Sequence, residues 1–213
     1  MSPPRDNSTL RLKVSLRSSL LAEIPAPVVL ETCGGYGRLF TWCYRDVAAG
    51  LVLEKDPRKT AVLAQQRPTW GVYECDCIGA LAAGIANEWP INYVDLDPWG
   101  QPWEILDALL VGQRSWPKLW GLVVTDGLRQ KLQYAGGWDV KSLAGLIEQY
   151  GNGCLYEHYV GLCRELVAQK AGAIGYTIGK WAGYHCGYNA EMTHYAALLT
   201  RTRSYAGAPV AAA

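Results

Sequence analysis

Acidic side chains end four short apolar segments of the sequence, and a glycine-rich turn follows the first segment. The acids are Glu31, Glu54, Asp76 and Asp97. The glycines of the turn are Gly34, Gly35 and Gly37, which lack a Cβ and let the backbone come close to a ligand. Hydrogen bonds to charged acceptors are among the strongest in proteins, so each carboxylate suits a hydroxyl, an amine or a positive charge. We therefore expect these segment ends to form one binding site.

The spacing of the acids narrows the class of ligand. Glu54 follows Gly35 by about 20 residues, the interval at which a carboxylate binds a ribose diol in dinucleotide-binding folds. A dinucleotide carries a pyrophosphate, which the other carboxylates would repel, and no Gly-Lys-Ser/Thr sequence follows the glycines to form a phosphate loop. An adenosine with a cationic tail and no phosphate fits four acids better. The pattern predicts S-adenosylmethionine as the cofactor, with another nucleotide-binding or purely structural turn as the alternative.

The segment Asp97-Pro98-Trp99 carries the groups that methylation of an aromatic amine needs. The lone pair of such an amine is delocalised into its ring, so the nitrogen is a poor nucleophile. The Asp97 carboxylate and the Pro98 carbonyl can accept its hydrogens, and Trp99 can stack on an extruded base for about 1–3 kcal/mol. Trp103 is a second candidate for stacking. A strand-ending turn with a core tryptophan is the alternative, and Asp95 is expected on the face opposite Asp97, as a structural or a functional residue.

A regular alternation of segments must position these residues. Short apolar runs cover residues 27–32, 50–56, 70–76, 91–98 and 119–127, with helix-compatible segments between them. Continuous apolar runs suit strands that are covered on both faces of a parallel sheet. Asp56-Pro57 predicts a helix start and Pro68 its end. The last two strand-like runs, at 173–183 and 191–201, predict an antiparallel hairpin. We predict an α/β fold, a doubly wound, Rossmann-like sheet of five parallel strands plus a C-terminal antiparallel hairpin.

Composition limits the remaining possibilities. The 213 residues carry a formal net charge of +1, so any nucleic acid or membrane partner needs a local patch. The seven cysteines form no Cys-x-x-Cys pair, which argues against a metal site and favours reduced thiols in a cytoplasmic protein. No apolar run reaches the roughly 20 residues needed to span a bilayer. We expect a basic arm or short helix at 1–26, one domain at 27–205 and a flexible tail at 206–213.

From about Pro27 to Arg201 the chain resembles the class I S-adenosylmethionine-dependent methyltransferases, in which five parallel strands and an antiparallel hairpin form a seven-stranded sheet. "ETCGGYG" is similar to their acid-x-Gly-x-Gly-x-Gly turn, with Cys33 in place of the first glycine. Asp-Leu-Asp-Pro-aromatic-Gly, and a fifth strand ending in Thr125-Asp126, resemble the catalytic core of the tRNA guanine-N2 dimethyltransferases. That family is longer and has an additional C-terminal domain, and the resemblance covers its catalytic core only.

The resemblance implies a role for particular residues. Glu31 would orient the methionyl ammonium, Glu54 would hold the ribose hydroxyls and Asp76 would face the adenine amine. The cofactor contacts implied in full are Glu31, Cys33, Gly35, Tyr36, Gly37, Glu54, Lys55, Asp76, Cys77 and Asp97. Asp97, Pro98 and Trp99 would be catalytic. Apart from the resemblance, we expect the substrate to be held by Trp99, Trp103, Arg17 and Lys180. The two cations would contact phosphates, with ordinary solvated surface as the alternative for them.

The predicted function is therefore transfer of a methyl group to an exocyclic amino nitrogen of a nucleobase in RNA or DNA, with nucleic acid as the partner. Two alternatives remain open. One is a methyltransferase for a protein amide or a small-molecule amine, which the near-neutral charge favours. The other is a non-catalytic subunit with a methyltransferase-like fold, for which Cys33 in the glycine turn would be a sign. The sequence leaves the oligomeric state undetermined.

Overall fold

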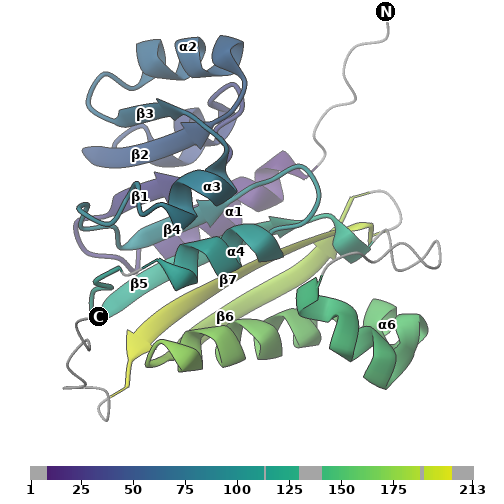
Figure 1. Cartoon of the computed structure of the whole chain (residues 1–213). Coiled ribbons are helices and arrows are strands. Elements are labelled where there is room, and N and C mark those ends of the chain that lie inside the picture. The colour runs from purple at the N-terminus through teal and green to yellow at the C-terminus, as the bar shows by residue number, and fades with distance from the viewer. Residues whose placement is uncertain (1–8, 113, 130–140, 188–189, 203–213) are drawn as a thin grey trace, which may run out of the picture.

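The computed structural model describes residues 9–112, 114–129, 141–187 and 190–202 and contains a single seven-stranded sheet (Figure 1). Its strand order is β3-β2-β1-β4-β5-β7-β6. The strands are β1 (Val28–Glu31), β2 (Ala49–Glu54), β3 (Gly71–Glu74), β4 (Tyr93–Leu96), β5 (Leu119–Asp126), β6 (Tyr176–Cys186) and β7 (Met192–Arg201). The first five are parallel, and β7 pairs antiparallel with both β5 and β6. The predicted fold class is confirmed.

Helices cover both faces of this sheet (Figure 1). One face carries α3 (Cys77–Ala82), α4 (Trp103–Val111) and α6 (Lys141–Ala173), and together they enclose the larger apolar cluster. The other face carries α1 (Leu10–Leu21), the π-helix η1 (Phe40–Tyr44) and α2 (Pro57–Gln66). Alternating strand residues divide between the two clusters, with Leu30 in the first and Val29 in the second. This double coverage explains the continuous apolar runs of the parallel strands.

Local sequence signals account for several element boundaries. The Asp56 side chain accepts a hydrogen bond from the Arg58 amide at 2.9 Å, and Pro57 opens α2, as predicted. Between β5 and the hairpin, α6 is divided into helical parts by non-helical backbone at Gly151, which has a φ of 72°, and at His158. The expected helix at 38–49 contributes only the short η1.

The N-terminal segment contributes more than an arm. Helix α1 packs on β5 and β7 through Leu16 and Leu20, which belong to the apolar cluster on that face of the sheet. Leu16 and Leu20 lie four residues apart, so they share one face of the helix. Residues 1–8 of the expected arm and the expected tail at 206–213 lie outside the described residues.

Candidate functional site

The sheet order reverses between β1 and β4, and ligands of open α/β sheets bind at such a point, beyond the carboxyl ends of the strands. Thr32, directly after β1, donates backbone and hydroxyl hydrogen bonds to the Asp95 carbonyl at 3.1 and 3.3 Å. Glu31 and Glu54 end their strands, and Asp76 and Asp97 follow theirs within two residues. The four predicted acids therefore all stand at one edge of the sheet.

The glycine turn and Glu54 form one hydrogen-bonded unit. Gly35 has a φ of 55°, and its amide donates to Glu54 Oε2 at 2.9 Å. Glu54 Oε1 accepts from the Asp56 amide at 3.0 Å. A Cβ on Gly35 would meet no atom within 4 Å, whereas one on Gly34 would lie 2.4 Å from Val52 Cγ2. The turn is thus closed against the core at Gly34 and open at Gly35, beside a carboxylate that backbone amides hold in place.

Glu31 is engaged by a protein cation. Its side chain is buried, and Arg67 Nη1 donates to Glu31 Oε2 at 2.5 Å. Burial raises the pKa of Glu31 to about 7, and the Arg67 charge offsets only part of that effect. Direct contact between Glu31 and a ligand ammonium would require the pair with Arg67 to open.

The remaining predicted cofactor residues lie around the turn and the start of α3. Asp76 is exposed and accepts from the Gly79 amide at 2.9 Å, so its carboxylate caps α3. The Cys33 and Cys77 thiols hydrogen-bond one another. That bond and burial raise the pKa of Cys33, and the same bond lowers the pKa of Cys77. Tyr36 and Lys55 are exposed. The structure therefore joins Cys33 to Cys77 and Gly35 to Glu54.

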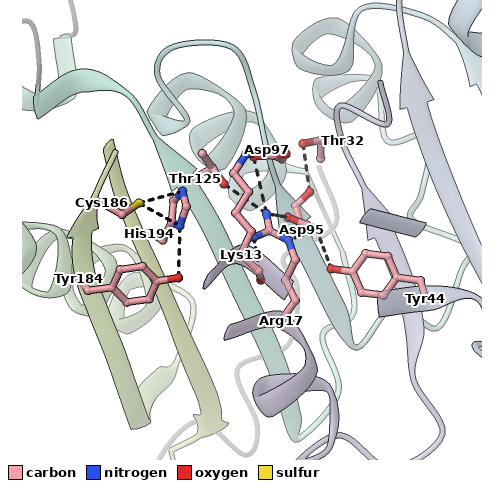
Figure 2. A network of polar contacts seen from close by, with 10 residues as sticks. All are labelled: Lys13, Arg17, Thr32, Tyr44, Asp95, Asp97, Thr125, Tyr184, Cys186 and His194. Atoms are coloured by element: carbon pink, nitrogen blue, oxygen red, sulfur yellow. Dashed lines mark hydrogen bonds and ion pairs between the residues drawn. The ribbon is translucent and has the colours of Figure 1, made fainter. Parts of the chain in front are cut away.

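Asp97 belongs to a charged network between α1 and the sheet (Figure 2). Lys13 Nζ lies 2.8 Å from Asp97 Oδ1, and Arg17 Nη2 lies 3.7 Å from the same oxygen. Burial opposes ionisation of Asp97, but Arg17 and Lys13 outweigh it, so the pKa of Asp97 is lowered. At neutral pH the Asp97 carboxylate is an ionised acceptor.

Arg17 is a structural residue, and its expected role as a phosphate contact was wrong. It is fully buried, and its Nε and Nη2 atoms each donate to an Asp95 oxygen at 2.7 Å. Tyr44 also donates to Asp95 at 2.6 Å (Figure 2). The expectation that Asp95 faces away from Asp97 was wrong too, because residues two apart on a strand share a face and both acids approach Arg17.

The two tryptophans proposed for base stacking differ completely in exposure. Trp99 is fully exposed, in a loop held by the hydrogen bond from the Gly127 amide to the Gly100 carbonyl at 2.8 Å. Trp103 is fully buried and stacks on Tyr195 with ring centroids 6.2 Å apart. Stacking of Trp103 on a substrate was therefore a wrong expectation, because α4 begins at this residue and turns it into the core.

Lys180 lies away from this network. It is exposed on β6, the edge strand, three strands from β4, and its Nζ lies 2.7 Å from Glu23 Oε1. Exposed pairs of this kind contribute little to stability. Nothing in this arrangement gives Lys180 a contact with Asp97 or Trp99.

Two residues that the sequence reasoning did not connect with Asp97 lie in its network or beside it. Lys13 is one; its spacing of four from Arg17 places both cations on one helix face, which is the signal that could have identified it. His194 is the other, buried on β7 with Cys186 Sγ 3.5 Å and Tyr184 Oη 3.3 Å from its Nδ1 (Figure 2). Burial, together with Lys13 and Arg17, lowers the pKa of His194 to about 3, so its imidazole is neutral.

Among the described residues no cluster of three or more His, Cys, Asp or Glu side chains could hold a metal ion. In the same part of the chain, no helix combines the length and apolar character needed to cross a membrane.

Comparisons with known proteins identify the fold. No protein-family model matches the sequence, and no curated protein is significantly similar to it. Solved structures do match. Trm1 from Pyrococcus horikoshii, in complex with S-adenosyl-L-methionine, is 12% identical with a TM-score of 0.58, over 96% of this chain and 60% of that one. The N-methyltransferase NodS from Bradyrhizobium japonicum WM9 is 11% identical with a TM-score of 0.57, over 93% and 100%. A Streptococcus thermophilus protein provisionally named a hemolysin is 15% identical with a TM-score of 0.60, over 95% and 69%.

Proposed function

We propose that this chain, which has the fold of Rossmann-like methyltransferases, is an S-adenosylmethionine-dependent methyltransferase. Its substrate would be an exocyclic amino nitrogen of a nucleobase in RNA or DNA. The observation that carries this proposal is the ionised Asp97 at the end of β4, followed by Pro98 and the fully exposed Trp99. Trm1, solved in complex with S-adenosyl-L-methionine, supports the cofactor, and NodS, an N-methyltransferase, supports the choice of reaction.

The glycine turn fits the proposed cofactor. Space is open beside Gly35, and the amides of Gly35 and Asp56 each hold one Glu54 oxygen while leaving lone pairs for ribose hydroxyls. When bound, the cofactor supplies an electrophilic methyl group on a sulfonium. Asp97 and the Pro98 carbonyl would accept hydrogen bonds from the substrate amine, and Trp99 would stack on the base. Holding the nitrogen in line with the methyl group would supply much of the rate enhancement.

Methyl transfer to an amine releases one proton. The amine nitrogen forms a bond to the methyl carbon, the carbon–sulfur bond breaks, and the methylated nitrogen loses a proton. The neutral His194 has its pKa lowered too far to take that proton at pH 7. We propose that Asp97 accepts a hydrogen bond from the substrate amine and that the released proton passes to solvent water.

Tritiated cofactor incubated with DNA, tRNA, protein and small-molecule fractions tests the proposal. We expect label that a nuclease removes and a protease does not. Asp97→Ala should abolish the transfer while calorimetry still detects S-adenosylhomocysteine, which we expect to bind in the micromolar range, about −8 kcal/mol. Asp46→Ala, at an exposed acid after η1, is the matched control. Undiminished transfer by Asp97→Ala would remove the catalytic assignment.

The same experiment tests the two alternatives. Label in the protein or small-molecule fraction would identify a protein amide or a small amine as the acceptor, a reading favoured by the net charge of +1 and the burial of Arg17. A chain without heat of binding for S-adenosylhomocysteine would be a non-catalytic subunit.

A further inference from the structure

A short helical segment after the glycine turn has one buried and one exposed face. Its backbone is helical from Arg38 to Tyr44, and Arg45 follows with helical dihedral angles. Phe40 and Tyr44 lie four residues apart and are buried against the sheet. Arg38, Trp42 and Arg45 are exposed, and their spacing of four and three residues places them together on the outer side of the segment. We call these three residues the η1 face.

Trp42 is the centre of the η1 face. The residue is 66% exposed, whereas tryptophan is highly buried on average in folded proteins. The neighbouring Phe40 ring packs edge-on against Trp70, with ring centroids 5.3 Å apart, and the Tyr44 hydroxyl donates to Asp95. Among the described residues, no ring or cation stacks on the Trp42 indole. Its flat surface is therefore free to stack on a ring of another molecule.

One arginine lies a helical turn before Trp42, and another lies a turn after it. In the part of the chain that the structure describes, the side chains of Arg38 and Arg45 make no ion pair and no hydrogen bond. Residues 36–46 contain one acid, Asp46, which is exposed. The η1 face therefore presents two unpaired guanidinium groups on either side of an exposed indole.

This positively charged surface extends to the glycine turn of the candidate site. Tyr36, between two glycines of that turn, is exposed, and Lys59 Nζ of α2 lies 5.8 Å from the centroid of its ring. Helix α2 packs closely here, since a Cβ on Gly37 would lie 2.1 Å from Gln66 Oε1. A second aromatic ring with a cation beside it thus lies between the η1 face and the open space at Gly35.

Aromatic rings alternating with cations match single-stranded nucleic acid. Its bases expose flat surfaces that stack on aromatic side chains, and its phosphates pair with guanidinium groups. A duplex hides those surfaces between its base pairs. A membrane surface requires a continuous apolar face, but the exposed neighbours of Trp42 in the segment are Thr41, Arg45 and Asp46.

The candidate site leaves the phosphates of such a substrate without the contacts expected for them. Arg17 is buried, and Lys180 lies on β6, three strands from β4. The η1 face provides two exposed guanidinium groups on the segment that follows the glycine turn directly, so a strand bound there would lie beside the site.

We propose that the η1 face binds single-stranded nucleic acid, with Trp42 stacked on a base and with Arg38 and Arg45 paired with the phosphates on either side of it. This inference rests on the proposed function, because it gives the nucleic acid substrate a binding surface. Its test measures binding without the cofactor. Binding can therefore fail while methyl transfer to nucleic acid is observed, and methyl transfer can fail while binding is observed.

Fluorescence anisotropy with short labelled oligonucleotides of mixed sequence tests the proposal. The probes are single-stranded RNA, single-stranded DNA and a duplex of the same length, each titrated at several salt concentrations. We expect the single strands to bind more tightly than the duplex, with an affinity that falls as salt rises. The tighter of the two single strands identifies RNA or DNA as the partner. Binding to phosphatidylserine vesicles without binding to either single strand overturns the proposal.

Three variants separate stacking from charge. Trp42→Ala should lower the affinity for the single strand about tenfold and leave its salt dependence unchanged, and Trp42→Phe should retain part of the affinity. Arg38→Gln and Arg45→Gln should each reduce the slope of log K against log salt by about 0.7, the value for one phosphate contact of a single strand. All of these side chains are exposed, so thermal unfolding should remain close to that of the unmodified protein.

Two exposed residues of α6, on the opposite face of the sheet, provide matched controls. Tyr150→Ala removes an exposed ring and Arg164→Gln removes an exposed cation, and both variants should bind as the unmodified protein does. A preference for the duplex, or an affinity that Trp42→Ala leaves unchanged, overturns the proposal, even where label from the cofactor enters nucleic acid.

Discussion

Lys13 and Asp97 lie 84 residues apart in the sequence, and the structure places Lys13 Nζ 2.8 Å from Asp97 Oδ1. Helix α1 therefore supplies a cation directly to the carboxylate proposed to receive the substrate amine. Arg17, one helical turn later, approaches the same oxygen at 3.7 Å. The charge state of Asp97 thus depends on a segment that precedes the whole sheet.

The pH dependence of methyl transfer should report this dependence on Lys13. Lys13→Met removes one of the two cations that lower the pKa of Asp97, so burial should raise that pKa in the variant. The ionised form of Asp97 is the hydrogen-bond acceptor. As the solution is acidified, the variant should therefore lose activity at a higher pH than the unmodified protein does. The acid limb of the pH–rate profile measures this shift.

Lys180→Met is the control for that profile, because Lys180 is exposed and pairs only with Glu23 in the described contacts. Its acid limb should coincide with that of the unmodified protein. If the acid limb of Lys13→Met also coincided with that of the unmodified protein, Lys13 would not set the ionisation of Asp97.

The pair of Arg17 and Asp95 should dominate stability on this face of the sheet. Both side chains are fully buried, and removing one partner leaves an uncompensated charge. We expect Arg17→Met to lower the free energy of unfolding by about 3–5 kcal/mol, measured by urea denaturation. The double variant Arg17→Met/Asp95→Leu should recover much of this loss, because neither charge remains. A double variant as unstable as the single one would contradict this account.

The glycine turn offers a sharp test of the proposed cofactor site. Gly35→Ala places a methyl group in the open space beside Glu54 and strains a backbone with a φ of 55° by about 1–2 kcal/mol. Gly151→Ala is a matched control, since Gly151 has a φ of 72° and its Cβ would also meet no atom within 4 Å, but it lies in α6. Gly151 has a ψ of 159°, in a region that essentially only glycine adopts, so Gly151→Ala should lose at least as much thermal stability as Gly35→Ala.

The two variants should differ in calorimetry. Gly35→Ala should lower the affinity for S-adenosylhomocysteine about tenfold, equivalent to 1.4 kcal/mol, and Gly151→Ala should leave it unchanged. Equal affinities in the two variants would mean that no ligand uses the space beside Gly35.

The sequence predicted the parts of this protein that local pattern determines. Continuous apolar runs identified the parallel strands, Asp56-Pro57 identified the start of α2, and the acids at the strand ends came together at one edge of the sheet. Those features depend on residues that are neighbours in the chain or on the common direction of parallel strands.

The errors fall where distant segments meet. Arg17 looked like a surface cation because its partner, Asp95, is 78 residues away and nothing local marks the pair. Trp103 was expected to stack on the substrate because it lies close to Trp99 in the sequence. That closeness does not indicate which side of α4 faces the core. The packing of α1 on the sheet was not predicted for the same reason. Four-residue spacing indicates which residues share a helix face but not which element that face packs against.

Asp126, at the end of β5, should give stability a measurable pH dependence. Its carboxylate is buried and accepts hydrogen bonds from Tyr159 and the Leu128 amide, both at 2.8 Å. Burial outweighs these bonds and raises the pKa of Asp126 from 3.8 to about 7. Below pH 3.8 the group is protonated in the folded and the unfolded chain. As the pH rises toward 7 the unfolded chain releases this proton first, so the contribution of Asp126 to stability falls, by roughly 4 kcal/mol at most.

Asp126→Asn removes this titration and retains an acceptor for the Leu128 amide. We expect the free energy of unfolding of the unmodified protein, relative to the variant, to decrease between pH 4 and pH 7 and to level off above pH 7. Urea denaturation at a series of pH values measures the difference, which cancels the opposite titration of buried His194. Curves for Asp126→Asn that run parallel to those of the unmodified protein would place the pKa of Asp126 near its ordinary value.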